Sequence, residues 1–115
     1  MTDQERIKRL AEWMGWHVEQ WADGEWICSS AGKITEVHHW NPLKKIGDAW
    51  MLVEKARKDS WWLSLAQYPS KAGPWRASFS FGGMAVSHEP RFRSEEPTAP
   101  LAICRAVERL MEGKP

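Results

Sequence analysis

Two segments with strictly alternating side chains, both in the C-terminal half, constrain the fold most. Trp61–Gln67 and Trp75–Phe81 each place large apolar residues at every second position, which is the period of a β-strand with one buried face. Gly82 and Gly83 follow the second segment and predict a two-residue turn into a third strand over residues 84–88. The C-terminal half is therefore expected to contain an antiparallel three-strand meander.

The predicted turn also sets the pairing of the last two strands. Phe81 would face Met84 and Phe79 would face Val86, which gathers an apolar set on one face of the hairpin. The opposite face is small and polar, since it carries Arg76, Ser78, Ser80, Ala85 and Ser87. Such a face meets solvent, lets a helix approach closely, or forms the floor of a ligand groove.

The N-terminal third predicts one helix followed by short extended segments. Thr2 and Glu5 have the spacing of a capping box, so a helix is expected over residues 3–14. Two or three short strands are expected after it, within Trp16–Trp21, Trp26–Cys28 and Ile34–Trp40.

A second helix is expected after the Asn-Pro pair that ends the extended part. Pro42 disfavours a helical conformation at the residue before it, so this helix cannot begin before Pro42, and it is expected to end at about residue 57 or 58. Its predicted buried stripe comprises Ile46, Ala49, Trp50, Val53 and Ala56.

The third helix is expected between Thr98, its N-cap, and Gly113, its terminator. Residues 89–96, just before it, are strongly charged and are predicted to form a surface loop. The order helix, short strands, helix, meander, helix predicts an α+β fold, here a layered αβα sandwich with a largely antiparallel sheet and three helices. A chain of 115 residues has room for one core, so residues 1–115 are expected to form a single domain.

Four blocks of sequence carry a family resemblance that spans nearly the whole chain. They are Met14-Gly15-Trp16, Trp40-Asn41-Pro42, Asp48-Ala49-Trp50 with Val53-Glu54, and Ala99–Ala106. In this order they resemble the phage ABA-sandwich domain family of small bacteriophage and prophage proteins. The resemblance implies an αβα sandwich and a phage origin, and it implies no established catalytic residues. Family members tend to have small polar and acidic residues after the proline, whereas this chain has Leu43-Lys44-Lys45.

Charge and cysteine content exclude several classes of protein. Sixteen Lys and Arg against 15 Asp and Glu leave a net charge of +1, which disfavours nucleic acid as the main ligand. Cys28 and Cys104 are too few for a disulfide framework and are expected to be free thiols. The polar N-terminus and the lack of a long apolar run predict a protein of the host bacterial cytoplasm with no membrane association.

Catalytic and metal-binding patterns are weak, so we expect neither an enzyme nor a cofactor or metal site. His38 and His39 are adjacent in an extended segment and would point to opposite faces, which prevents shared chelation of one metal. Cys104 with His88, or Ser78 or Ser80 with His39, could be imagined as nucleophile and base. However, no nucleophile elbow, phosphate loop or carboxylate pair accompanies them.

Nine tryptophans in 115 residues are several times the usual content of roughly 1–1.5%, and we expect some of them to form a contact surface. Trp50 is assigned to the core, and Trp16, Trp61 and Trp75 are expected to be at least half buried. An exposed indole near a guanidinium can stack a nucleobase while the guanidinium binds phosphate. The candidate ligand-binding residues are Trp40, Asn41, Trp62, Arg76, Arg91 and Arg93.

The sequence therefore favours a non-enzymatic phage accessory protein that acts by binding. One hypothesis is that it sequesters a nucleotide-derived defence signal of the host. The other is that it binds and modulates a host protein through exposed aromatic residues. Homo-oligomerisation is compatible with both hypotheses.

Overall fold

The computed structural model describes residues 2–21, 24–28, 34–36, 40–67, 74–81 and 91–113, of which 19–21, 24–28, 34–36 and 91 are described by their backbone alone. The predicted turn and strand over residues 82–88 lie outside these ranges, as do His38 and His39. The elements in chain order are α1 (Asp3–Trp13), β1 (His17–Trp21), β2 (Gly24–Cys28), β3 (Ile34–Glu36), α2 (Ile46–Lys58), β4 (Trp61–Gln67), β5 (Trp75–Phe81), β6 (Arg91–Glu96) and α3 (Ala99–Glu112).

The C-terminal half forms an antiparallel three-strand meander, as predicted, in the order β4-β5-β6. Its last strand differs from the prediction, however. Phe79 lies opposite Leu63 on one side and opposite Phe92 on the other. Both neighbouring positions in the sheet are therefore occupied, and the predicted pairing of Phe79 with Val86 is wrong.

Residues 91–96 were predicted to form a surface loop, and this prediction is also wrong because they form β6. The many charged residues of this segment hid the alternation of inward and outward side chains that is typical of a strand. Phe92 and Ser94 point inward and are 5% and 3% exposed. Arg93 and Glu95 alternate with them along the strand and are exposed. The hydroxyl of Ser94 donates a hydrogen bond to the carbonyl of Ala102, so the polar inward residue is satisfied by α3.

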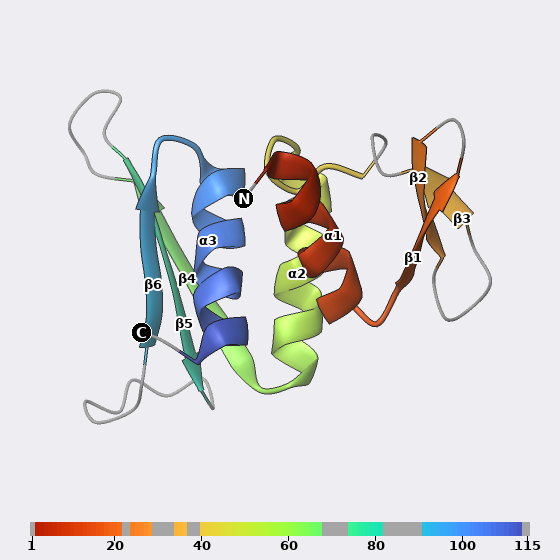
Figure 1. Cartoon of the computed structure of the whole chain (residues 1–115). Coiled ribbons are helices and arrows are strands. Elements are labelled where there is room, and N and C mark those ends of the chain that lie inside the picture. Colours follow the sequence, from red (N-terminus) through yellow and green to blue (C-terminus); the bar gives the residue numbers. More distant parts are fainter. Residues whose placement is uncertain are drawn as a thin grey trace.

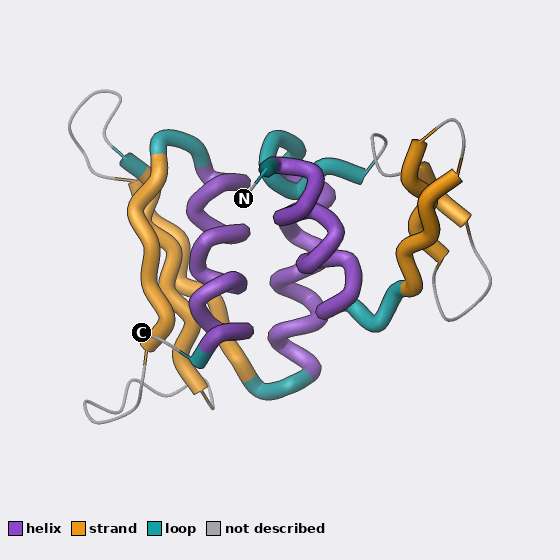
Figure 2. The backbone as a smooth tube through the Cα atoms, viewed as in Figure 1, coloured by secondary structure: helices purple, strands orange, loops and turns teal. Residues whose placement is uncertain are grey.

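The elements form layers, and the helices lie between the two sheets (Figure 1). The meander occupies one end, α3 packs on β5 and β6, and α2 packs beside it on β4. The β1-β2-β3 sheet lies at the opposite end, beyond α1 and α2 (Figure 2). The chain is thus an α+β sandwich of three helices with antiparallel sheets, as the sequence predicts. No described element packs on the meander face turned away from the helices.

The three helices begin and end close to the predicted positions because their caps are local. At α1, the Thr2 hydroxyl accepts a hydrogen bond from the Glu5 amide, and the Glu5 carboxylate accepts one from the Thr2 amide. At α3, the Thr98 hydroxyl accepts a hydrogen bond from the Leu101 amide. Gly113 ends α3 with a φ of 69°, a left-handed conformation that glycine adopts without steric cost.

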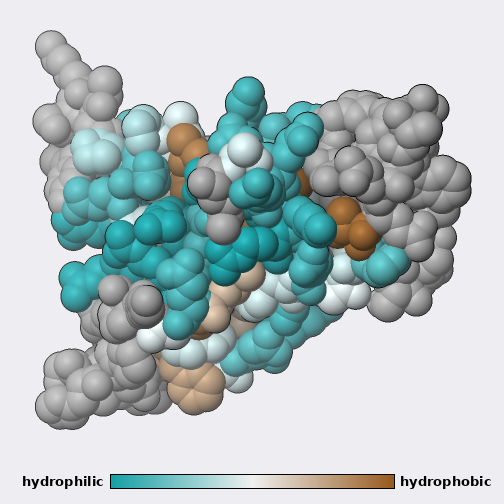
Figure 3. All heavy atoms as spheres, viewed as in Figure 1, coloured by the Kyte–Doolittle hydropathy of each residue, from teal (hydrophilic) through white to brown (hydrophobic). Residues whose placement is uncertain are grey.

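One face of each helix contributes to a single core. Its fully buried members include Leu10 of α1, Leu52 of α2, Phe79 of β5, and Ile103 and Val107 of α3. The visible surface of α1 and α3 is mainly hydrophilic (Figure 3). Trp16, Trp61 and Trp75 are only partly exposed, which confirms that they are at least half buried.

The predicted core stripe of α2 needs a correction at two positions. Ile46 and Trp50 are 49% and 46% exposed, whereas Leu52 is fully buried. The buried stripe is in fact Ala49, Leu52, Val53 and Ala56. Small residues at 49 and 56 let α2 approach its neighbours closely, which rotates the larger Ile46 and Trp50 out of the packed face.

The segment before α2 is held by a side chain from the first turn of that helix. The Asn41 amide donates a hydrogen bond of 2.8 Å to Asp48 Oδ2. The Asn41 side chain in turn accepts a hydrogen bond of 3.2 Å from the Leu43 amide. These contacts connect two of the sequence blocks that carry the family resemblance and show that both serve to start the helix.

We expect Asp48→Ala to lower the free energy of unfolding by about 1–2 kcal/mol, because it removes the acceptor that holds the turn before α2 and leaves the part-buried Asn41 amide unpaired. Lys44→Ala, on the same segment but at an exposed position, should change it by less than about 0.5 kcal/mol. Urea denaturation of both variants measures the difference. Equal effects would show that the contact between Asn41 and Asp48 contributes nothing specific.

Candidate functional site

The uncovered face of the meander carries three of the predicted ligand-binding residues. We call it the outer face and define it by the side chains that point away from the helices. Strand pairing arranges them in rows: Trp62 opposite Ser80, Ser64 opposite Ser78 opposite Arg93, and Ala66 opposite Arg76 opposite Glu95. Arg91 lies opposite Ser80 in the strand pairing, and its side chain lies outside the described residues. Serines therefore form the middle of the outer face, and Trp62 and the arginines lie around them.

A hollow of about 380 Å³ lies at the β6 edge of the meander. It is lined by Arg76, Arg93 and Glu95 of the outer face and by Ser94 and Arg109, which lie on the helix side. Arg76 donates a hydrogen bond of 3.1 Å to Glu95, and both side chains are about half exposed. Neither Arg93 nor Arg109 makes an ion pair with another described residue. Three guanidinium groups against one carboxylate leave an excess of positive charge, so this hollow suits an anion.

Trp62 provides the flat apolar surface of the outer face, since its side chain is 47% exposed. The guanidinium carbon of Arg57 lies 5.9 Å from the centre of its ring. From standard strand spacings, the Cα atoms of Trp62 and Arg93 are about 12 Å apart. Both side chains are long, so a single elongated ligand can contact the indole and the arginine hollow together.

The structure does not bring Trp40 and Asn41 together with the other candidate ligand-binding residues. Trp40 is 3% exposed, and its ring packs edge-on against Trp16 with centroids 4.9 Å apart. Its indole N–H finds no hydrogen-bond acceptor among the described residues. Asn41 serves the start of α2. The sequence break at Asn-Pro thus marks a buried helix entry, because Trp40 fills the space beside Trp16.

Arg109 is the member of the hollow that sequence reasoning missed. It lies on the last turn of α3, where a basic residue is simply expected to complement the helix dipole. It reaches the hollow only because α3 runs back along β6, which brings its last turn near Arg93. No signal in the sequence pairs a residue of α3 with one of β6.

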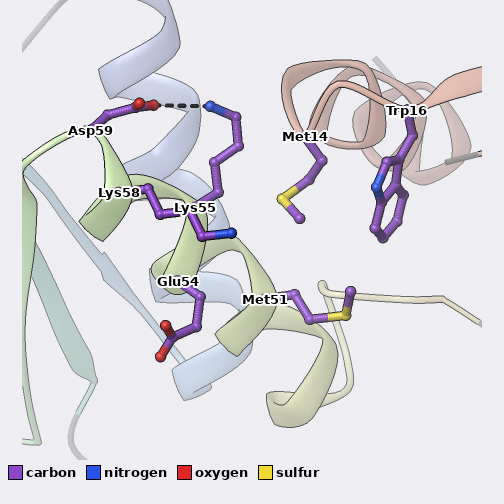
Figure 4. Close-up of a pocket in the computed structure, with 7 residues that line it drawn as sticks. All are labelled: Met14, Trp16, Met51, Glu54, Lys55, Lys58 and Asp59. Atoms are coloured by element: carbon purple, nitrogen blue, oxygen red, sulfur yellow. Dashed lines mark hydrogen bonds and ion pairs between the residues drawn. The ribbon is translucent and has the colours of Figure 1, made fainter. Parts of the chain in front are cut away.

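A second cavity, of about 470 Å³, opens between the end of α1 and the exposed side of α2. Met14, Trp16 and Met51 form its apolar wall, and Glu54, Lys55, Lys58 and Asp59 form its charged wall (Figure 4). The Lys55 ammonium forms an ion pair with Asp59 at 2.9 Å and lies over the ring of Trp13. Two cations balance two carboxylates here, so this cavity offers an anion no net attraction.

A third hollow, of about 330 Å³, lies between α1 and α3 and is lined by Arg6, Arg9, Glu96, Arg105, Glu108 and Glu112. Arg6 forms a two-point contact with Glu108, with distances of 2.6 Å and 3.2 Å. This hydrogen bonding raises the pKa of Arg6. Equal numbers of arginines and glutamates line the hollow, and its central pair joins two helices, so its role is structural.

Cys104 is a buried free thiol, as the sequence predicts. Desolvation by burial raises its pKa, the negative charge of Glu108 raises it further, and Arg6 opposes the shift. The thiol therefore stays protonated, and it lies on α3 away from the outer face. The side chain of Cys28 lies outside the described residues.

The raised pKa of Cys104 predicts an alkaline loss of stability. Stability is fully present below the pKa of the unfolded thiol, about 8.5, and falls above it because only the unfolded chain then loses the proton. The expected slope is about 1.4 kcal/mol per pH unit. Urea denaturation of Cys28→Ser from pH 7 to 10 measures this slope, and adding Cys104→Ala should remove it. An unchanged slope in the double variant would contradict the assignment.

Within the described ranges, no three His, Cys, Asp or Glu side chains group together in a way that could hold a metal ion. The predicted nucleophile–base pairs involve His39 or His88, and both histidines lie outside those ranges. None of the described helices is long and apolar enough to cross a membrane.

Comparison with known families gives one match. The sequence model described as the phage ABA sandwich domain matches residues 10–107, which covers most of the chain and contains the blocks at Met14, Trp40, Asp48 and Ala99. Comparison with curated proteins and with solved structures gives no match.

Proposed function

Because the chain belongs to the phage ABA sandwich domain family, we propose that it is a phage accessory protein that acts by binding rather than by catalysis, and that its ligand is a nucleotide-derived anion held on the outer face. The observation that carries the proposal is the hollow of Arg76, Arg93 and Arg109 at the β6 edge, beside the outer face that carries the exposed Trp62.

Each part of the outer face suits one part of such a ligand. Guanidinium groups bind phosphate through paired hydrogen bonds, and an exposed indole stacks a base at about 1–3 kcal/mol. The hydroxyls of Ser64, Ser78 and Ser80 lie between these two regions and can bind sugar hydroxyls.

The spacing within the outer face bears on the size of the ligand. The Cα atoms of Trp62 and Arg93 are about 12 Å apart, and a ligand with two nucleoside units or a diphosphate bridge is long enough to contact both side chains. Cyclic dinucleotides and ADP-ribose derivatives meet this requirement. Sequestration of such a ligand would remove a host defence signal from solution, and host cytoplasm is the compartment where it would act.

The test is calorimetric titration of the protein with cyclic dinucleotides, ADP-ribose, a mononucleotide and inorganic phosphate. We expect binding of a two-nucleoside or diphosphate-bridged ligand that is stronger than binding of phosphate. Arg93→Glu should weaken it at least about tenfold, since a charge-assisted contact contributes about 1.5–3 kcal/mol. Trp62→Ala should weaken the nucleotide but leave phosphate binding unchanged.

The matched control is Lys58→Glu, which makes the same charge reversal at the neutral cavity beside α2 and should leave affinity unchanged. If none of the nucleotides binds, or if Lys58→Glu weakens binding as much as Arg93→Glu does, the outer face is not the site.

A second candidate function, binding and modulation of a host protein, is favoured by one observation. Ile46, Trp50 and Met51 leave apolar surface exposed on α2, and such surfaces mark protein interaction sites. In this case Trp50→Ala would abolish capture of a stoichiometric protein partner, and nucleotides would produce no heat of binding.

A further inference from the structure

The two outer strands of the meander, β4 and β6, differ sharply in charge. β6 has charged side chains at four of its six positions, namely Arg91, Arg93, Glu95 and Glu96. β4 has the sequence Trp-Trp-Leu-Ser-Leu-Ala-Gln and no charged residue in seven positions. Charged side chains are the usual protection of an edge strand against pairing with another chain. β6 is therefore protected, whereas β4 is not.

The apolar side of β4 is also less well covered than that of β6. Trp61, Leu63 and Leu65 point toward the helices but are only partly buried. At the other edge, Phe92 and Ser94 are 5% and 3% exposed, because α3 packs directly on β5 and β6. The described helices thus leave apolar surface along β4, at the edge where the strand has no described partner on its other side.

The sequence of β4 is complementary to itself when two copies run antiparallel. If Ser64 lies opposite Ser64 of the second copy, all seven residues of each strand find a partner. Leu63 then faces Leu65 of the second copy on the helix side. On the outer face, the bulky Trp62 faces the small Ala66 of the second copy. Cross-strand pairs of this kind stabilise a sheet, and the two-fold symmetry repeats each favourable pair.

We propose that the β4 edge is a homodimer interface, in which two copies of this chain pair β4 with β4 in the register centred on Ser64. The two meanders then form one six-stranded antiparallel sheet whose outer faces are continuous. The interface is a single pair of strand edges and is smaller than that of a permanent dimer, so we expect a monomer–dimer equilibrium that depends on concentration. This proposal does not depend on the ligand proposed above.

Charge at position 64 tests both the edge and the register. Ser64 is exposed in the single chain, so Ser64→Lys and Ser64→Asp should fold normally, which circular dichroism checks. In the dimer each variant places two like charges opposite one another, so the dimer dissociation constant should rise about fivefold or more. An equimolar mixture of the two variants places Lys opposite Asp and should restore association.

Sedimentation equilibrium over micromolar to near-millimolar concentrations is the measurement, with Arg93→Glu on the protected β6 edge as the control. The proposal predicts a monomer–dimer equilibrium for the unmodified chain and for Arg93→Glu. It is overturned if the unmodified chain stays monomeric at every concentration, or if the mixture of Ser64 variants associates no better than each alone. It is equally overturned if Arg93→Glu alone abolishes the dimer.

Discussion

Phe79→Ala should lower the free energy of unfolding by about 3–5 kcal/mol, the largest effect of any single substitution that we expect in this chain. Phe79 is fully buried at the centre of the middle strand. Its neighbours across the sheet are Leu63 on β4 and Phe92 on β6. Truncation would leave a cavity that neither sheet neighbour nor α3 can fill without moving a strand. Urea denaturation measures the change.

Phe81 supplies the matched control for this substitution, because it is the same residue type on the same strand and the same face. Its side chain is 47% exposed, and it contacts Trp61 edge-on with centroids 5.2 Å apart. Phe81→Ala should therefore cost only about 1 kcal/mol. If the two substitutions cost the same, the meander does not have the register that places Phe79 at the centre of the core.

The second large effect is expected from Arg6→Ala, which should lower the free energy of unfolding by about 2–4 kcal/mol. Glu108 is only 4% exposed, and Arg6 is its partner through two hydrogen bonds. Removal of the guanidinium leaves a buried carboxylate without its cation. The Arg6 side chain is 21% exposed, so solvent screens part of the effect and the loss falls short of that for a fully buried pair.

Arg9 gives the control for Arg6, one turn further along the same helix. Its guanidinium lies 4.0 Å from the carboxylate of Glu112 of α3, and both side chains are more than one-third exposed. Arg9→Ala should cost less than about 1 kcal/mol. A further variant, Arg6→Ala with Glu108→Gln, should recover part of the lost stability because no buried charge is left. A double variant no more stable than Arg6→Ala would show that the charge of Glu108 is not the cause.

Several elements could be predicted from sequence because their causes are local. The capping box at Thr2, the cap at Thr98 and the left-handed Gly113 lie within a few residues of the ends that they determine. The alternation in Trp61–Gln67 and Trp75–Phe81 is likewise a property of each segment alone. The family blocks were recognisable for a related reason, since Asn41 and Asp48 form one hydrogen-bonded helix start.

The wrong predictions have a different cause, because two segments or two side chains can compete for one position in the fold. Nothing local distinguishes residues 84–88 from 91–96 as partner of β5, and the segment with Phe92 holds that place. Trp50 and Leu52 are both apolar and two positions apart on α2. Which of them is buried depends on where α3 and the meander meet the helix, and Leu52 takes the buried position.

The same distinction between local and tertiary causes applies to the candidate site residues. Trp62 and Arg76 could be chosen from sequence because strand alternation places them on the face opposite Leu63 and Phe79. Arg93 was chosen as an exposed arginine of a predicted loop, and the structure places it in β6 on the same face. The exposure of Trp40 could not be predicted, because a tryptophan beside a helix break can be exposed or buried. Its burial depends on Trp16, which comes from another segment. Arg109 could not be found because its neighbours in the hollow come from β5 and β6.

The sequence by itself determined the family, the three helices with their ends, and the strands with clear alternation, since all of these depend on residues close together in the chain. Only the tertiary structure decided that the helices lie between the sheets and leave the outer face uncovered. It also decided that the arginine hollow forms beside β6. The physical reason is that packing and charge neighbourhoods depend on distances in space between segments, which periodicity along the chain does not encode.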